Sequence, residues 1–226
     1  MAQLPSLLLC AVIGYLLGSV SAGILYSHLL GSDIRRHGSK NPGASNMLRI
    51  YGMNAGTITF IFDCAKAIGA VLLGRLIAGQ NGAMAAGFFA IIGHNWPLYF
   101  GFKGGKGIAC CTGVFVFAFP ALGIPAVLLD ILTIVLTRYI SLGSMVLVIS
   151  YAILVSVFKG LWPAGVWAIA LALIAIWRHW GNLQRLKNGT ERKIGQKEEN
   201  KAEGGENVTF FRKESNEPAC GVKDYD

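Results

Sequence analysis

Residues 93–109 read GHNWPLYFGFKGGKGIA and lie between two strongly hydrophobic stretches of the chain. Their centre, Lys103-Gly104-Gly105-Lys106-Gly107, combines two lysines with three glycines. Glycine lets backbone N–H groups turn toward a common point, and the lysines add positive charge. This glycine loop (residues 103–107) is therefore predicted to hold an anion. It is not a Walker A loop, because Gly107 follows Lys106 where that motif has serine or threonine.

The composition around this loop indicates an integral membrane protein. Of the 226 residues, 54% are hydrophobic and 14% charged, and several apolar runs approach twenty residues. A helix needs about 20 such residues to cross a bilayer core of roughly 30 Å. Residues 1–186 carry twelve Lys/Arg and three acids, whereas residues 187–226 carry eight and nine. In a membrane protein, this basic body points to lipid headgroups or an acidic substrate rather than to nucleic acid.

The pattern of apolar segments predicts an all-α fold, a polytopic bundle of seven transmembrane helices. Residues 108–137 would make a helix of about 45 Å, too long for one span, so Pro120 and Pro125 are expected to divide them into two short helices. The other expected spans are Leu4–Leu30, Tyr51–Ala78, Gly82–Phe100, Ile140–Phe158 and Leu161–Trp177. In the first, Gly14-x-x-x-Gly18 offers a face for close helix packing.

The distribution of basic residues predicts the orientation of these spans. Cytoplasmic loops carry an excess of Lys and Arg. With seven spans and the N-terminus outside, nine basic residues of the body face the cytoplasm, and only Arg75 and Lys159 lie outside. Four polar elements then meet on the cytoplasmic face: residues 31–49, the glycine loop, residues 138–141 and residues 178–191. Residues 1–192 are expected to form the membrane domain. Residues 193–226 are expected to form a charged, disordered tail, so that the C-terminus lies in the cytoplasm.

Two charged residues lie inside the second expected span. Asp63 and Lys66 are three apart and so share one helix face. Charges in lipid are rare unless they are buried and mutually satisfied. The pair is expected to be a structural ion pair within the bundle or a wall of the active site. The five cysteines form no C-x-x-C pair, and they are interpreted as small hydrophobic residues.

The polar segment 31–49 supplies groups suited to a phosphate. Pro42 and Gly43 turn the chain, and a guanidinium fork with hydroxyls and amides fits a phosphate monoester. The groups concerned are Ser39, Asn41, Ser45, Asn46 and Arg49. The alternative is a loop that follows the positive-inside rule and whose Ser and Asn residues cap helices. For the glycine loop, the alternative is a tight turn between helices.

The histidines leave the general base open. His94 lies at a span end and is either a packed residue or a base, whereas His179 and Asn182 are three apart on a helical end and can act together. No Ser-His-Asp arrangement is recognisable, and three acids in the body cannot build a carboxylate magnesium site, so no metal is expected. His28-x-x-x-x-Asp33 matches a motif of another glycerolipid acyltransferase class, and we interpret that match as coincidence.

Four motifs in order resemble a known family. They are GSKNPGASNMLR at residues 38–49, His94-x-x-Pro97 with residues 100–107, RYISLGS at residues 138–144, and Arg178-His179-x-x-Asn182 with Arg185, Gly189 and Glu191. Together they resemble the bacterial acyl-phosphate glycerol-3-phosphate acyltransferase family, PlsY, over residues 4–191. Ser45 stands where that family usually has threonine, and residues after 192 lie outside its pattern.

This resemblance implies a seven-helix enzyme of the bacterial inner membrane with its site on the cytoplasmic face. The enzyme would transfer a fatty acyl group from acyl phosphate to the sn-1 hydroxyl of glycerol 3-phosphate, giving lysophosphatidic acid and phosphate without a cofactor. The residues assigned to catalysis are Ser39, Arg49, His94, Lys106, His179 and Asn182. Those assigned to substrate binding are Arg35, Asn41, Ser45, Asn46, Lys103, Gly104, Gly105, Gly107, Ser141 and Ser144, and those assigned to structure are Asp63, Lys66 and Glu191.

The chemistry of an acyl phosphate suits such a site. The donor is already activated, so the enzyme has mainly to position the hydroxyl and stabilise charge. We hypothesise that a phosphate oxygen of glycerol 3-phosphate is the base, with His94 or His179 as the alternative. The rival interpretation is an organic-phosphate transporter or channel, in which Asp63 and Lys66 could form a gate. The sequence leaves the oligomeric state open and is compatible with a monomer.

Overall fold

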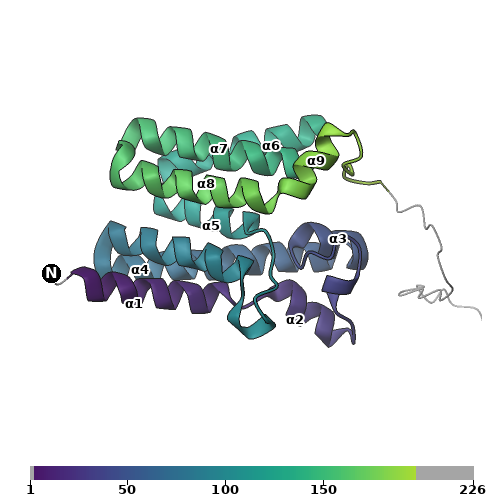
Figure 1. The fold of residues 1–226 in the computed structure, drawn as a ribbon, viewed down its shortest axis with the longest axis horizontal. Coiled ribbons are helices and arrows are strands. Elements are labelled where there is room, and N and C mark those ends of the chain that lie inside the picture. The colour runs from purple at the N-terminus through teal and green to yellow at the C-terminus, as the bar shows by residue number, and fades with distance from the viewer. Residues whose placement is uncertain (1–2, 197–226) are drawn as a thin grey trace, which may run out of the picture. The chain divides into compact units, whose positions relative to one another are not determined.

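Residues 3–196 of the protein are described by the computed structural model, and their regular structure is entirely helical (Figure 1). The α-helices are α1 (Gln3–Gly18), α2 (Ala22–Leu29), α3 (Ala44–Tyr51), α4 (Met53–Asn95), α5 (Ile108–Ala118), α6 (Pro120–Thr137), α7 (Ile140–Lys159), α8 (Val166–Arg178) and α9 (Trp180–Lys187). Short helical turns are η1 (Ile34–Arg36), η2 (Leu98–Phe100) and η3 (Leu161–Gly165). The all-α prediction is thus confirmed for this part of the chain.

The first apolar segment is broken into two helices. Expected as one span from Leu4 to Leu30, it forms α1 and α2, separated by three residues at 19–21. Helix α1 packs on the second half of α4 through its small residues. A Cβ on Gly14 would lie 2.2 Å from the carbonyl oxygen of Ala86, and one on Gly18 would lie 2.1 Å from that of Ala90. The predicted Gly-x-x-x-Gly packing face is therefore confirmed.

Helix α4 is a hairpin of two helical halves. Ala78 and Gly79 have non-helical backbone angles, and Gly79 has a φ of 60° that glycine adopts without strain. After this break the chain turns back on itself, and a Cβ on Gly74 would lie 2.3 Å from the carbonyl oxygen of Gly82. The two halves correspond to the second and third expected spans, although the helix ends at Asn95 rather than at Phe100.

The stretch 108–137 divides as predicted. Helix α5 ends at Ala118, and α6 begins with Pro120 at its first position, where the missing N–H of proline is not needed. Arg75 of α4 donates hydrogen bonds to the carbonyls of Phe117 (2.7 Å) and Ala118 (3.1 Å). Pro125 lies inside α6 and does not divide it. The boundary therefore falls at Phe119, with a cation bonded to the otherwise unsatisfied carbonyls at the end of α5.

The remaining helices complete the bundle. Helix α5 lies between α4, which packs with α1, and α6, which packs with α7 and through it with α8 (Figure 1). Aromatic rings fill the centre: Phe115 stacks on Tyr151 with 3.7 Å between centroids, and Trp167 donates from its ring nitrogen to the carbonyl of Met84. After α9 the chain returns to the bundle, where the N–H of Ile194 donates to the carbonyl of Arg138 at 2.8 Å.

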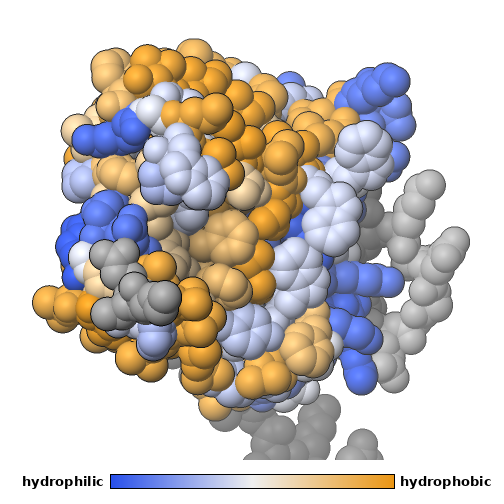
Figure 2. Space-filling model, turned by 60° about the vertical axis from the view of Figure 1, so that its left-hand side comes forward, coloured by the Kyte–Doolittle hydropathy of each residue, from blue (hydrophilic) through white to orange (hydrophobic). Residues whose placement is uncertain are grey.

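The surface of the described residues carries much exposed apolar side-chain area. Four helical stretches are long and apolar enough to cross a membrane: Leu4–Leu29, Pro120–Thr137, Ile140–Lys159 and Leu161–Arg178. Helix α5 is apolar but has only 11 residues. Figure 2 shows apolar surface across the middle of one face, with hydrophilic groups gathered toward its left and right sides. This pattern is that of a membrane protein.

The described cysteines lie within the helical body and form no disulfide among themselves. Cys10, Cys64, Cys110 and Cys111 are free, and the Cys64 and Cys110 thiols donate to the backbone carbonyls of Ala109 and Asp63. The full burial of Cys10, Cys110 and Cys111 agrees with their interpretation as small hydrophobic residues. The compact body runs from the N-terminal helix to Ile194. Most of the predicted tail, from residue 197 onward, lies outside the described residues, as does Cys220.

Candidate active site

The glycine loop is packed directly against the end of α4. The N–H of Gly105 donates to the carbonyl of His94 at 3.1 Å. A Cβ on Gly104 would lie 2.1 Å from that same carbonyl oxygen, and one on Gly105 would lie 2.1 Å from Nε2 of His94. Gly107, with a φ of 82°, then leads into α5. Close backbone approach thus requires glycine at 104 and 105, and a positive φ favours it at 107.

Arg178, at the end of α8, holds the loop from the other side. Its Nη2 donates to the carbonyls of Gly104 at 3.2 Å and Gly105 at 2.6 Å. Its guanidinium also lies 5.4 Å from the ring centroid of Trp96, within the range of a cation–π contact. The sequence prediction left Arg178 out of the site residues, although its position in the Arg178-His179 motif was a usable signal.

Lys106 begins a chain of polar contacts across the site. Its Nζ donates to Oδ1 of Asn182, whose Nδ2 donates to Oε1 of Glu191 at 2.6 Å. Arg185 donates to the other carboxylate oxygen of Glu191 at 2.7 Å. Asn182 cannot rotate its amide without breaking this chain, because Lys106 has no acceptor and the Glu191 carboxylate has no donor. Glu191, predicted as structural, therefore orients Asn182.

The charges around Lys106 make this region strongly electropositive. Burial and the nearby charges of Arg185, Arg178 and Arg49 together lower the pKa of Lys106 to about 8, against the opposing effect of Glu191. Burial alone would raise the pKa of Glu191, but the hydrogen bonds from Asn182 and Arg185 outweigh it and leave that pKa below its usual value. Three arginines therefore lie near Lys106 and only the carboxylate of Glu191 opposes them there, so the region has an excess of positive charge that favours anions.

The segment 31–49 contributes Arg49 to this region. It is not a plain loop, since it contains η1 and most of α3. Arg49 lies in the last turn of α3 and is close enough to Lys106 to affect its pKa. Ser39 is exposed just before the turn at Pro42, and Asn41 and Ser45 are half-buried beside it. The expected convergence of this segment with the glycine loop is thus present at Arg49.

Two residues of the segment have different contacts from those expected. Oδ1 of Asn46 accepts from the N–H of Ser39 and Nδ2 donates to the carbonyl of His37, both at 3.0 Å. Arg35 forms a forked contact with Asp33 and donates to the carbonyl of Phe100 at 3.0 Å. Both side chains thus help to hold the segment in shape, and their expected role in phosphate binding stays a prediction.

The carboxylate of Asp33 is also bound within the segment, by Arg35. Hydrogen bonds from Arg35 lower the pKa of Asp33 to about 2. His28 lies 3.9 Å from Asp33 and its side chain is 47% exposed. The carboxylate is thus bound to Arg35 and makes only a long contact with His28, which agrees with the interpretation of the His28-x-x-x-x-Asp33 spacing as coincidence.

The start of α7 adds two buried serines to this region. The hydroxyl of Ser144 donates to the carbonyl of Ile140 at 2.9 Å, one turn back in the same helix. Ser141 lies nearer the helix start and approaches the carboxylate of Glu191. Lys103 of the glycine loop is exposed. All four polar elements predicted to meet are therefore represented, although Ser144 is already bonded to its own helix.

His179 occupies the turn between α8 and α9. Its Nδ1 lies 2.8 Å from the carbonyl oxygen of Ala175, and burial together with the charge of Lys106 lowers the pKa of His179 to about 4. The imidazole is thus neutral near pH 7. Because a carbonyl can only accept, Nδ1 carries the proton and Nε2 is left as an acceptor. His179 can receive a hydrogen bond but is a weak base.

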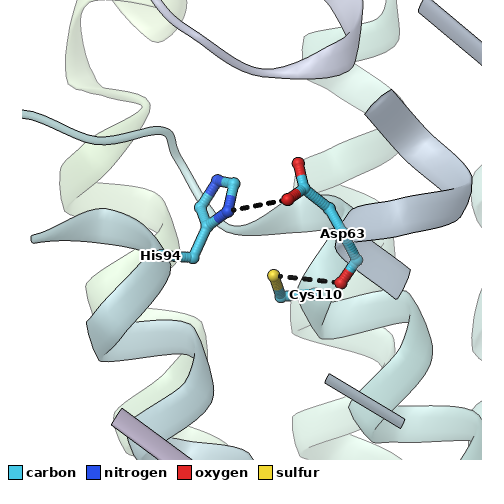
Figure 3. A group of neighbouring side chains, drawn as sticks. All are labelled: Asp63, His94 and Cys110. Atoms are coloured by element: carbon cyan, nitrogen blue, oxygen red, sulfur yellow. Dashed lines mark hydrogen bonds and ion pairs between the residues drawn. The ribbon is translucent and has the colours of Figure 1, made fainter. Parts of the chain in front are cut away.

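His94 lies in a different, enclosed environment. Its side chain is 3% exposed, and Nδ1 is 3.4 Å from Oδ1 of Asp63 and 3.1 Å from Nζ of Lys66. The thiol of Cys110 donates to the backbone carbonyl of Asp63 at 3.3 Å (Figure 3). Although Asp63, His94 and Cys110 have the ligand types of a metal site, the ammonium of Lys66 lies 2.7 Å from the same Asp63 oxygen. A cation is thus already present there.

The chain is similar to known proteins over most of its length. A family model described as glycerol-3-phosphate acyltransferase matches residues 8–189. The glycerol-3-phosphate acyltransferase of Thermoanaerobacter pseudethanolicus is 42% identical over 192 residues, covering 84% of this chain and 97% of the relative. That of Halalkalibacterium halodurans is 44% identical over 197 residues, covering 83% and 96%.

Two solved structures have the same fold. Both are crystal structures of PlsY, an integral membrane glycerol 3-phosphate acyltransferase. The glycerol 3-phosphate form has a TM-score of 0.78 and 33% identity, and the lysophosphatidic acid form has a TM-score of 0.75 and 32% identity. Each match covers 84% of this chain and 96% of the solved chain. The chain therefore belongs to the glycerol-3-phosphate acyltransferase family.

Proposed function

We propose that this protein transfers a fatty acyl group from acyl phosphate to the sn-1 hydroxyl of glycerol 3-phosphate, giving lysophosphatidic acid and inorganic phosphate. The observation that carries the proposal is the set of cations Arg49, Lys106, Arg178 and Arg185 around the Lys106–Asn182–Glu191 contacts. Three separated parts of the chain supply them. Such a site suits two phosphorylated substrates, because cations attract phosphoryl groups and stabilise charge that develops on them.

The reaction needs positioning more than a strong base. The sn-1 hydroxyl oxygen attacks the acyl carbonyl carbon, the bond between that carbon and the phosphate oxygen breaks, and inorganic phosphate leaves. The hydroxyl proton passes to a phosphate oxygen of glycerol 3-phosphate. Two features support this assignment: His94 is enclosed by Asp63, Lys66 and Gly105, and the pKa of His179 is about 4. His179 can still orient the hydroxyl through Nε2.

Analogues of glycerol 3-phosphate test the position of transfer. Propane-1,3-diol monophosphate keeps the hydroxyl that corresponds to sn-1, and propane-1,2-diol 1-phosphate keeps only the one that corresponds to sn-2. Turnover of the first and not the second is expected, and the reverse preference would overturn the sn-1 assignment.

The alternative of a transporter is tested by measuring phosphate release and acylated product together. Flux of glycerol 3-phosphate into liposomes without phosphate release would indicate a transporter instead.

The site is proposed to face the cytoplasm of a bacterial cell membrane, with seven spans. These would be α1 with α2, the two halves of α4, and α5, α6, α7 and α8 with η3. Lys159 and Arg75 then lie on the outer side, and Lys103 lies inside. Lys159→Cys and Lys103→Cys are each introduced singly into a chain whose five native cysteines have been replaced. A membrane-impermeant maleimide should label Lys159→Cys from outside the membrane and Lys103→Cys from inside. Labelling of both from one side would contradict the proposed orientation.

A further inference from the structure

A buried cluster of three ionisable residues lies under the glycine loop. Asp63 and Lys66 come from the first half of α4, and His94 from the end of its second half, 28 residues beyond Lys66. Their exposed fractions are 1%, 9% and 3%. The turn of α4 at Ala78 and Gly79 brings the two halves together, so that Lys66 reaches Asp63 at 2.7 Å and His94 at 3.1 Å. Asp63, Lys66 and His94 thus form a buried cluster.

The two ring nitrogens of His94 face different partners. Nδ1 faces Asp63 and Lys66 inside the bundle. Nε2 faces Gly105, where a Cβ would lie 2.1 Å from it, and the backbone N–H of Gly105 donates to the carbonyl of His94. The glycine loop therefore rests on His94 through both side chain and backbone. Any rotation of the imidazole would disturb the residue directly before Lys106.

The other end of the cluster contacts the break in the first apolar segment. Nζ of Lys66 donates to the carbonyl of Val20 at 2.5 Å, between α1 and α2. Helix α2 in turn packs on the segment that carries Arg49, because a Cβ on Gly23 would lie 1.9 Å from the carbonyl oxygen of Pro42. The cluster thus joins the support of the glycine loop to the support of the 31–49 segment.

The energetics of buried charge indicate that this cluster does more than stabilise the bundle. Removing an ion pair from water has a large cost, and well-packed apolar residues are often as stable in its place. Three ionisable groups that fix one geometry are therefore better explained by specificity than by stability. We propose that Asp63, Lys66 and His94 are positioning residues, which set the glycine loop and Lys106 relative to the segment that carries Arg49. The link to catalysis rests on the proposed function.

Two substitutions of His94 separate its two faces. His94→Asn keeps a polar atom near the position of Nδ1 and leaves the space under Gly105 empty. His94→Gln places a polar atom near the position of Nε2, against Gly105. Both variants are purified in detergent beside the unchanged protein, and only folded, monodisperse protein is compared. The measurements are KM for each phosphorylated substrate, kcat, and the rate of tryptic cleavage after the exposed Lys103, identified by mass spectrometry.

The expected result for His94→Asn is a KM for at least one phosphorylated substrate that rises by roughly ten- to a hundredfold, since misplaced groups cost about that much. Cleavage after Lys103 should become several-fold faster, and His94→Gln should restore both values toward those of the unchanged protein. Unchanged KM and cleavage in folded His94→Asn, with only a lower yield or melting temperature, would overturn the proposal. A loss of kcat at unchanged KM and cleavage would also overturn it, because His94 would then act in the chemical step.

The cleavage assay needs no substrate, so it separates this inference from the proposed reaction. If the unchanged protein shows no acyl transfer, the proposed function fails while cleavage still reports whether His94 holds the loop. If acyl transfer occurs but cleavage does not respond to His94→Asn, the positioning role fails alone. Lys66→Met combined with Asp63→Asn provides a second test, which removes both charges without leaving one unpaired, and faster cleavage is again expected.

Discussion

Lys106 donates a hydrogen bond to Oδ1 of Asn182, although 76 residues separate the two in the sequence. This contact joins the glycine loop to α9, and Glu191 fixes the amide of Asn182 from the far side at 2.6 Å. Arg178 adds a second connection by donating to the carbonyls of Gly104 and Gly105. The loop and the C-terminal polar segment therefore form one unit of the site.

Removal of the cations should weaken the binding of substrate phosphate. Arg49→Ala and Lys106→Ala are each expected to raise KM for one of the two phosphorylated substrates by roughly ten- to a hundredfold, since a hydrogen bond to a charged group contributes about 1.5–3 kcal/mol. Initial rates measured with each substrate varied in turn will show which one responds. Arg36→Ala is the control, because Arg36 is an exposed cation of the same segment. Normal saturation curves for both substrates in both variants would remove the site assignment.

The charge of Lys106 should make activity depend on pH. Its pKa is about 8, so the ammonium is protonated below that pH and loses its proton as pH rises through it. kcat/KM, which reports ionisations of the free enzyme, should therefore fall above about pH 8. Lys106→Arg keeps its charge over this pH range, so kcat/KM of this variant should not fall above pH 8. An identical high-pH decline in Lys106→Arg would show that another group is responsible.

The glycine loop should not tolerate a side chain at Gly105. In Gly105→Ala the new Cβ would meet Nε2 of His94 at 2.1 Å, so loop or imidazole must move, and we expect kcat/KM to fall at least tenfold. Gly101→Asn is the matched control, since its φ of 64° is one that asparagine tolerates and nothing lies within 4 Å of its Cβ position. If the two variants had the same kcat/KM, the close contact between Gly105 and His94 would not matter for activity.

The contact between α1 and α4 predicts a stability effect away from the site. Gly14→Ala places a Cβ 2.2 Å from the carbonyl oxygen of Ala86, and overpacking of this kind costs about 1–3 kcal/mol. Gly69→Ala, also in a helix, meets nothing within 4 Å and should be neutral or stabilising by about 0.5–1 kcal/mol. Unfolding of both variants in the same detergent checks this difference. Equal melting temperatures would show that α1 does not pack as described.

Features of the fold that depend on neighbouring residues can be predicted from the sequence, whereas features that depend on distant contacts cannot. Helix boundaries such as Phe119 before Pro120 could be predicted, because proline acts on its own neighbours. The break at residues 19–21 has a weak local signal in Gly18, Ser19 and Ser21, but its geometry depends on a distant contact, because the Val20 carbonyl finds its partner in Lys66, 46 residues away.

The site residues divide in the same way. The polar side chains of Lys106 and Asn182 predict that both belong to the site. Their direct contact, however, depends on how α8 and α9 approach the glycine loop. The amide of Asn46 predicts a contact with phosphate, whereas in the structure both ends of that amide bond to the backbone at His37 and Ser39. Amide and guanidinium groups suit phosphate and backbone equally, so residue type could not predict that Asn46 and Arg35 contact the backbone.

A single incubation can identify both the acyl donor and the acceptor. Purified protein is incubated with glycerol 3-phosphate and either acyl phosphate or an acyl thioester of the same chain length, and lysophosphatidic acid and inorganic phosphate are both quantified. We expect equal amounts of the two products from acyl phosphate and none from the thioester. Lysophosphatidic acid from the thioester but not from acyl phosphate would contradict it.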